Sequence, residues 1–320
     1  MDGQAKAAGT PAIAGDSVAT LLRNLIDYAG LFPPASLAMS PAVANYEKYA
    51  RSEFAWTLGR FIVPAGRLGE FQEAVGSLGS SSGQKAGGWD LSVLLGPDVP
   101  GDFARVSEFN SQHPSDSFAI EAKIESVEVK VTTPAEIEKF SKVICAEMET
   151  YFEIPWAGAA GSGNVRDCVK AVAACGRRAK IRTGGETADK FPPAEVVIEF
   201  MEACAAGGVA FKATAGLHHP VRSRHRLTYQ PDSPLGMMYG FLNVFLAAAF
   251  VRAGMDVPLA LELLNEQSRD AFEFDSYGAS WRGHRLPVDQ ISIARRSFSV
   301  SFGSCSFTEP IDDLRSLHLL

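Results

Sequence analysis

Short apolar runs alternate with amphipathic helical stretches along most of this chain of 320 residues. Residues 61–65, for example, form an apolar run, and residues 68–78 have the apolar spacing of a helix. Strands that alternate with helices usually lie parallel and are covered by those helices. Eight strand-like runs occur, at residues 61–65, 91–96, 118–131, 151–156, 179–185, 209–216, 272–276 and 298–306. Eight units favour a closed (β/α)8 barrel of the TIM type.

An open, doubly wound sheet is the alternative architecture for the same alternation. Such sheets often bind nucleotides through a GxGxxG or GxxxxGK[ST] loop between a strand and a helix. Neither pattern is present in this chain. The closed barrel is therefore the preferred prediction.

The N-terminal part of the chain differs in character from the rest. Residues 1–16 are small and polar, and we expect a disordered tail that leaves residues 17–320 as one barrel domain. Helical spacing in residues 18–28 and 41–52 predicts a helical extension that precedes the barrel.

A long, partly helical insertion is expected late in the barrel, after the run at residues 209–216. Its most apolar segment, residues 235–251, is short for a bilayer span and contains Asn243. We expect a buried helix there, at a subunit interface of a homo-oligomer.

The composition narrows the classes of partner. A formal net charge of −7 does not indicate a nucleic-acid-binding protein or one that binds an anionic membrane. The five cysteines include no CxxC pair, so neither a disulfide framework nor a zinc ribbon is indicated. We expect a cytoplasmic protein whose partner is a small anionic or carbonyl substrate.

Charged residues share one parity within the strand-like runs, and apolar residues share the other. Phe152 and Ile154, for example, lie on the opposite face from Glu153. In residues 118–131 the parity changes near Glu125 and Ser126, which predicts a β-bulge. If the apolar face packs against the helices, the charged face lies inside the barrel. The interior charges predicted in this way are Glu121, Lys123, Glu153, Lys180, Arg182, Lys212, Glu273 and Asp275.

Charges inside a barrel are costly unless they are paired or hydrated. The eight predicted charges therefore indicate either an ion-pair lattice that holds the barrel together or a wet cavity with a catalytic or binding role. We interpret them as a cavity, because charged networks with perturbed pKa values concentrate at functional sites.

Lys180 and Lys212 lie at equivalent places on two successive strands, so we expect their side chains to be neighbours. A lysine beside other cations has a lowered pKa, and its free amine can attack a carbonyl to form a Schiff base. Glu153 or Glu121 would then transfer protons. The expected substrate-binding residues are Arg182, Thr214, His218, His219, Glu121, Lys123, Glu273, Asp275 and Ser304.

The sequences KIRTGG (180–185) and KATAG (212–216) resemble the two lysine motifs of the deoxyribose-phosphate aldolase group of class I aldolases, K-T-S-T-G and K-x-S-G-G. The resemblance implies a (β/α)8 barrel and a lyase without a cofactor. It also implies that Lys180 is the Schiff-base lysine and that Lys212 adjusts its reactivity. Arg182 replaces a small residue of the first motif, and Thr214 and Ala215 replace Ser-Gly of the second.

Two other functions are compatible with the sequence. His218 or His219, with an interior carboxylate such as Glu153, would hold a divalent metal ion in a metal-dependent lyase or hydrolase, although no HxH or HExxH spacing is present. The third hypothesis is a non-catalytic barrel that binds an anionic metabolite, or another subunit through residues 235–251.

Overall fold

The structure is a computed structural model that describes residues 16–78, 88–112, 121–156 and 164–320. Residues 1–15, which make up nearly all of the expected disordered tail, lie outside the described part. Asp16 already belongs to the first helix, α1 (Asp16–Leu22).

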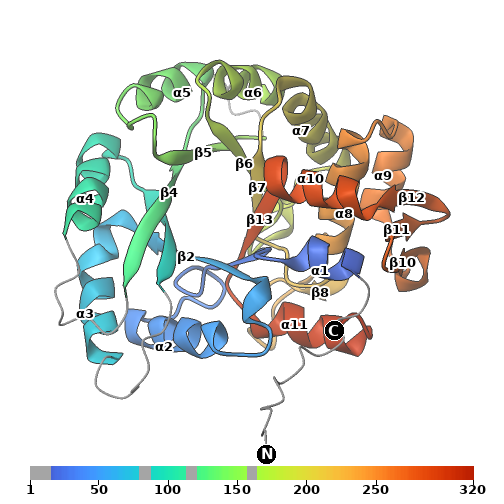
Figure 1. Ribbon diagram of the computed structural model, residues 1–320, viewed down its shortest axis with the longest axis horizontal. Helices are drawn as coiled ribbons and strands as arrows, with labels where there is room; N and C mark the ends of the chain where they lie inside the picture. Colours follow the sequence, from blue (N-terminus) through green and yellow to red (C-terminus); the bar gives the residue numbers. More distant parts are fainter. Residues whose placement is uncertain (1–15, 79–87, 113–120, 157–163) are drawn as a thin grey trace, which may run out of the picture.

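Eight strands form a closed parallel barrel in the order β1-β13-β7-β6-β5-β4-β3-β2 (Figure 1). The prediction of a (β/α)8 barrel is confirmed. The barrel strands are β1 (Ile26–Tyr28), β2 (Leu58–Pro64), β3 (Trp89–Leu95), β4 (Ala122–Lys130), β5 (Glu149–Ile154), β6 (Arg178–Arg182), β7 (Phe211–Thr214) and β13 (Ser299–Ser304).

Helices surround this ring of strands (Figure 1). The first six strands are each followed by one α-helix, and the last strand is followed by α11. These helices are α2 (Met39–Ala50), α3 (Leu68–Leu78), α4 (Val99–Ser111), α5 (Pro134–Ser141), α6 (Val165–Ala174), α7 (Ala194–Gly207) and α11 (Thr308–Ser316). Short 3-10 turns lie at η1 (Ala55–Thr57), η2 (Ala65–Arg67), η3 (Ala188–Lys190) and η4 (Arg269–Ala271).

Aromatic and aliphatic side chains fill the layer between strands and helices. Phe211 of β7 packs edge-to-face on Phe200 of α7, with ring centroids 5.1 Å apart. Phe302 of β13 stacks on Phe241 at 5.3 Å. The apolar parity of the strands therefore faces the helices, as predicted, and its burial stabilises the barrel from outside.

Two strand segments differ from the prediction. β1, which pairs with β13 and β2, lies within the segment expected to be helical. Helix α1 ends at Leu22, and Asn24 has a φ of 49°, so the chain turns before the strand. Three residues are too few to show an alternation in the sequence. The N-terminal extension is therefore α1 alone, and α2 is the first helix of the barrel.

The run at residues 272–276 does not belong to the barrel. Its residues form β10 (Phe272–Phe274), which pairs antiparallel with β11 (Gly278–Trp281) in a separate sheet completed by β12 (His284–Pro287). Figure 1 shows this sheet at the right-hand edge of the molecule, outside the ring of helices.

The expected insertion lies between β7 and β13. It contains this sheet and a two-stranded hairpin formed by β8 (Ser223–Arg226) and β9 (Leu235–Met238). Its α-helices are α8 (Phe241–Arg252), α9 (Val257–Asn265) and α10 (Val288–Ser297). Residues 241–250 of α8 are all buried, and the helix packs against α7, α9, α10 and β13. Its own chain thus covers the helix, which corrects its expected role as a subunit interface. No helix in the described ranges is long and apolar enough to cross a membrane.

One buried cation ties the insertion to the barrel. Arg295 of α10 donates hydrogen bonds from Nε to the carbonyl of Leu21, at 2.8 Å, and from Nη2 to that of Arg23, at 3.1 Å. Its Nη1 donates to the carbonyls of Ser299 and Val300. Burial lowers the pKa of Arg295 to about 9. One guanidinium therefore joins α10 to α1, to the turn that precedes β1 and to β13.

We predict that Arg295→Ala lowers the free energy of unfolding by about 3 kcal/mol or more, because it leaves buried carbonyls without donors. Urea denaturation would measure the loss. Arg296→Ala is the matched control, since Arg296 is exposed and bonds only to Ser292 of its own helix turn among the described residues. Equal effects of the two substitutions would contradict the assigned role of Arg295.

Candidate active site

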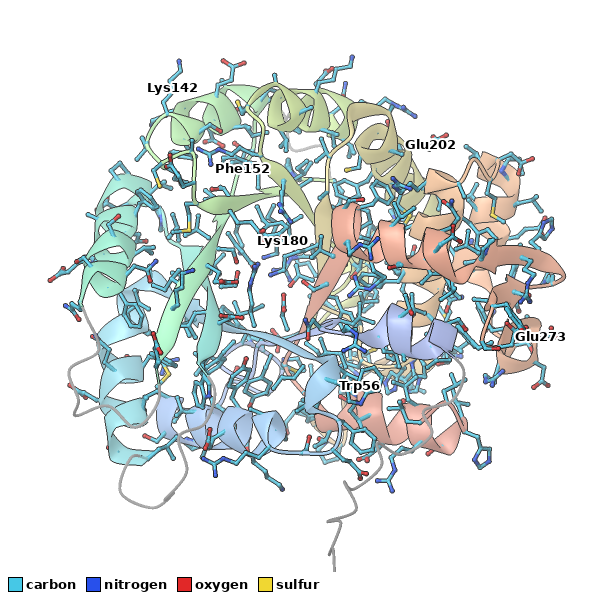
Figure 2. The ribbon with its side chains drawn as sticks, viewed as in Figure 1. Trp56, Lys142, Phe152, Lys180, Glu202 and Glu273 are labelled. Carbon is cyan, nitrogen blue, oxygen red and sulfur yellow. The ribbon has the colours of Figure 1, made fainter. Side chains whose placement is uncertain are left out.

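Two buried lysines share one carboxylate inside the barrel. Lys180 of β6 contacts Oε2 of Glu128 at 2.7 Å, and Lys212 of β7 contacts Oε1 of the same residue at 2.7 Å. Glu128 comes from β4, across the barrel interior. Figure 2 shows Lys180 within the ring of strands. The expected proximity of the two lysines is explained by this carboxylate, which bridges them.

Further charges extend this contact at both ends. Lys212 also contacts Oδ2 of Asp27 at 2.6 Å, and Lys180 also contacts Oε2 of Glu153 at 2.8 Å. Arg182 then approaches Oε1 of Glu153 at 3.5 Å. The result is a chain of six alternating charges, here called the charge chain, whose members in order are Asp27, Lys212, Glu128, Lys180, Glu153 and Arg182.

Strand register explains much of this arrangement. Glu153, Lys180 and Lys212 are direct partners on the adjacent strands β5, β6 and β7. Ser301 of β13 is the next partner in the same row. Side chains at matched positions of neighbouring parallel strands point the same way, so the row places its polar groups together inside the barrel.

Serine hydroxyls add hydrogen bonds to the two carboxylate oxygens that contact Lys212. Ser92 donates to Oε1 of Glu128 at 2.8 Å and accepts from Ser126 at 2.8 Å. Ser301 donates to Oδ2 of Asp27 at 2.8 Å. Buried carboxylates need such donors, because an unpaired buried charge is strongly destabilising.

The charge chain becomes more exposed toward the C-terminal ends of the strands. The side chains of Lys212 and Glu128 are 1% exposed. That of Lys180 is 6% exposed, and those of Glu153 and Arg182 are 10% and 35% exposed. Arg182 is the last residue of β6. The chain therefore opens at the C-terminal mouth of the barrel, the end at which barrel enzymes carry their active sites.

Ion pairing fixes the charge state of the two lysines. Burial alone would lower the pKa of Lys180, but the carboxylates of Glu128 and Glu153 outweigh burial and raise it. Burial is likewise outweighed at Lys212, whose pKa is raised by Asp27 and Glu128. Both lysines are thus ammonium ions at neutral pH in the resting site. The expectation that neighbouring cations lower their pKa is wrong, because each amine contacts carboxylates instead.

The carboxylates show the complementary effect. Burial would raise the pKa of Glu128, yet Lys180 and Lys212 outweigh it and hold the pKa far below 4.5. The pKa of Glu153 is lowered in the same way by Lys180 and Arg182. All four groups are therefore charged at neutral pH.

Four predicted interior charges lie outside the barrel interior. Glu121 is exposed just before β4, and the Lys123 side chain is 70% exposed. Lys123 pairs with Asp90 near the start of β3, so it is exposed because it lies at the N-terminal end of the barrel. The bulge at Glu125 then moves the interior parity of β4 to Ser126 and Glu128.

The other two exposed charges belong to β10 and the turn that follows it. Figure 2 shows Glu273 at the periphery of the molecule. Asp275 is exposed and forms a pair of hydrogen bonds with Nη2 of Arg285, at 2.7 and 2.8 Å. These corrections follow from the misassigned run at residues 272–276, which does not belong to the barrel.

Sequence reasoning missed Asp27 and Glu128, the two acids that hold Lys212. Glu128 lies between Val127 and Val129, both buried, so the alternation after the bulge did contain a signal for it. Asp27 is the central residue of a three-residue strand and offered no comparable signal.

Thr214 and Ser304, both predicted substrate-binding residues, end two strands at the mouth. Thr214 is the last residue of β7 and is half-buried, and Ser304 is the last residue of β13 and is buried. The loop after β7 passes close to the loop after β6. Gly216 has a φ of +72°, and a Cβ there would lie 2.8 Å from Cα of Gly184, so this approach requires glycine.

His218 and His219 follow β7 and form hydrogen bonds with carboxylates of the last helix. Nδ1 of His218 lies 3.0 Å from Glu309, and Nδ1 of His219 lies 2.6 Å from Asp313. They contact α11 rather than the carboxylates of the charge chain. Among the described residues, no three His, Cys, Asp or Glu side chains come together as a metal site.

Comparisons with protein-family models, curated proteins and solved structures find no match for this chain. The fold and the charge chain are therefore the features that bear on its function.

We predict that acid unfolding depends strongly on Glu128. Because its pKa is lowered on folding, its ion pairs stabilise the protein above the ordinary pKa of 4.5 and are lost as the pH falls through its folded pKa. The free energy of unfolding should therefore fall less steeply below pH 4.5 in Glu128→Gln than in the wild type. Urea denaturation across this pH range would measure both slopes.

Glu138→Gln is the matched control, because Glu138 is exposed on α5. Its slope should equal that of the wild type. An unchanged slope in Glu128→Gln would mean that the buried pairs do not contribute to acid stability.

Proposed function

We propose that this barrel is a lyase of the aldolase type. It would act on a small carbonyl compound that carries an anionic group, through an imine on Lys180. The observation that carries the proposal is the position of Lys180 in the charge chain. Its Nζ lies 2.7 Å from Glu128 and 2.8 Å from Glu153, close to the C-terminal mouth.

Lys180 is preferred to Lys212 as the nucleophile because of its surroundings. Lys212 is fully enclosed and bound to Asp27 and Glu128, and it is an ammonium ion in the resting site. Lys180 lies one step nearer the exposed end of the charge chain, next to Glu153, which can exchange protons with both the amine and a bound substrate. The resemblance of residues 180–185 to the first aldolase motif supports the same choice.

The chemistry requires Lys180 to lose a proton before it attacks. The free amine adds to the carbonyl carbon, and loss of water gives the iminium ion. In the cleavage direction, Glu153 removes the proton of a hydroxyl two carbons from the iminium carbon. The bond between the carbon next to the iminium carbon and the carbon that carries this hydroxyl then breaks. The hydroxyl-bearing carbon leaves as a carbonyl product, and the electrons of the broken bond form an enamine. Glu153 returns the proton to the enamine carbon, and hydrolysis releases the product.

Arg182 and Thr214 would bind the anionic part of the substrate. Arg182 is the most exposed member of the charge chain, and its contact with Glu153, at 3.5 Å, is long for an ion pair with a hydrogen bond. A guanidinium held this loosely can turn toward a phosphate or carboxylate. Ser304 ends β13, in the part of a barrel that often binds phosphate.

Reductive trapping tests the central claim. We predict that cyanoborohydride with a panel of small aldehydes and ketones, with and without a phosphate or carboxylate group, gives a mass adduct on Lys180. Lys180→Met should lose the adduct, whereas Lys170→Met should keep it because Lys170 is exposed on α6. Lys212→Met should still form the adduct on Lys180, but more slowly than the wild type. Peptide mass spectrometry locates the adduct.

An adduct on Lys212 alone would reverse the two lysine roles. Consumption of a carbonyl substrate without any adduct would indicate that Lys180 acts as a proton donor without forming an imine. That second mechanism is favoured by one observation, the raised pKa of Lys180.

The pH dependence of trapping follows from the same raised pKa. Below the pKa of Lys180, the free-amine fraction increases about tenfold with each pH unit. We predict that the initial rate of adduct formation at Lys180 rises about tenfold for each pH unit between pH 6 and pH 8. Exposed lysines on the same protein provide the internal reference. A flat profile at Lys180 would show that its amine is already neutral, contrary to the ion pairs described above.

A further inference from the structure

A cavity of about 760 Å³ opens at the opposite end of the barrel from the mouth. Its walls come from the N-terminal ends of β2 and β3, from β13 and from the last turn of α2. They include Ala50, Arg51, Gly59, Asp90 and Ser301. We call it the basal cavity. The charge chain, by contrast, is most exposed at the mouth.

The inner wall of the basal cavity contains Asp27, the last acid of the charge chain, and its hydrogen-bond partner Ser301. Gly59 permits this position, because a Cβ there would lie 2.2 Å from Oδ1 of Asp27. The backbone N–H of Arg60 donates to that same oxygen at 2.8 Å. The charge chain therefore extends from the mouth to a second open space.

The lining of the basal cavity suits water. Charged residues border it on several sides, namely Arg51, Arg60, Asp90 and Glu125 in addition to Asp27. A polar space of this size with several hydrogen-bonding groups holds water. Its aromatic residues, Tyr46 and Trp89, pack on each other edge-to-face at 4.8 Å.

We propose that the basal cavity is a proton exit for Lys180. In this inference Lys212, Glu128 and Asp27 pass protons between Lys180 and water in the cavity, on the opposite side of the barrel from the substrate. The inference rests on the proposed imine chemistry, which requires Lys180 to become a free amine. It adds a role for Asp27 and for a face of the barrel that the aldolase resemblance does not involve.

Each proton transfer in this path balances. Asp27 receives a proton from Lys212 across 2.6 Å and releases it to water in the cavity. Glu128 receives a proton from Lys180 on Oε2, turns its protonated carboxyl and donates to the now neutral Lys212. The net change is one proton moved from Lys180 to water. Lys212, Glu128 and Asp27 end in their starting charge states.

The geometry favours release of the proton into the basal cavity over its release at the C-terminal mouth. A bound substrate would lie against Glu153 and Arg182 and would exclude water there. The inner contacts, at 2.7, 2.7 and 2.6 Å, form a continuous path that substrate binding does not interrupt. Proton transfer needs donors and acceptors within hydrogen-bond reach, and every step meets that condition.

Access to the barrel interior is tested first, without any activity measurement. Ser301→Cys places a thiol on the cavity wall, and a small methanethiosulfonate reagent should label it. Adding Ala50→Phe, which fills the cavity from α2, should slow labelling about tenfold or more, because the reagent must then wait for local opening. Ala44→Phe is the matched control on the exposed face of the same helix. Labelling of the exposed Cys145 provides the internal rate reference.

The proton path is tested next, in a background with the native Ser301. Ala50→Phe should slow reductive trapping at Lys180 by roughly tenfold to 100-fold, whereas Ala44→Phe should leave the rate unchanged. Ala55→Phe fills the same cavity from η1 and serves as the second plug if Ala50→Phe does not fold. Thermal unfolding confirms that each variant is folded.

The outcomes separate the two proposals. Slower labelling together with slower trapping supports the exit path. If the adduct forms on Lys180 at a rate that neither Ala50→Phe nor Ala55→Phe changes, the exit path is wrong and the proposed function stands. If the thiol of Ser301→Cys does not react in the protein without a cavity-filling substitution, and trapping is normal, the exit path is wrong as well. No adduct on Lys180 in any variant overturns the proposed function, and the exit path with it.

Discussion

The interior of this barrel depends on one carboxylate shared by two lysines. Each buried ammonium is costly to desolvate, and contact with Glu128 offsets that cost for both Lys180 and Lys212. The carboxylate faces inward because β4 contains a bulge just before Ser126. Without that extra residue the parity of the strand would reverse, and Glu128 would point at the helices instead. A local irregularity of one strand therefore determines the charge state of residues on two others.

Charge balance along the chain also has a consequence for binding. Asp27, Glu128 and Glu153 neutralise Lys212, Lys180 and Arg182 in the resting site. In the proposed mechanism, an anionic substrate that binds Arg182 would draw this cation away from Glu153 and so remove one of the charges that lower the pKa of Glu153. Substrate binding and the acid–base group would thus be coupled through one loose ion pair, at 3.5 Å.

Parity within strands predicted much of the site but not its electrostatics. It assigned Glu153, Lys180, Arg182 and Lys212 to the interior, because alternation is a local property of the sequence. The raised pKa values of the lysines depend on acids from β1 and β4, which the sequence does not relate to β6 and β7. Strand β1 was missed because the apolar spacing of α1 continues into it. The run at residues 272–276 was misassigned because antiparallel strands alternate in the same way.

Stability alone does not explain why the charge chain is present. Replacing a buried ionic network by well-packed apolar side chains is often neutral or stabilising, and barrel interiors are usually filled by Val, Ile and Leu. A purely structural lattice would also have no reason to become steadily more exposed in one direction. Here the side-chain exposure rises from 1% at Glu128 to 35% at Arg182, toward the C-terminal ends of the strands. This gradient joins the buried ion pairs to an accessible cation, as the proposed acid–base chemistry on a bound anion would require.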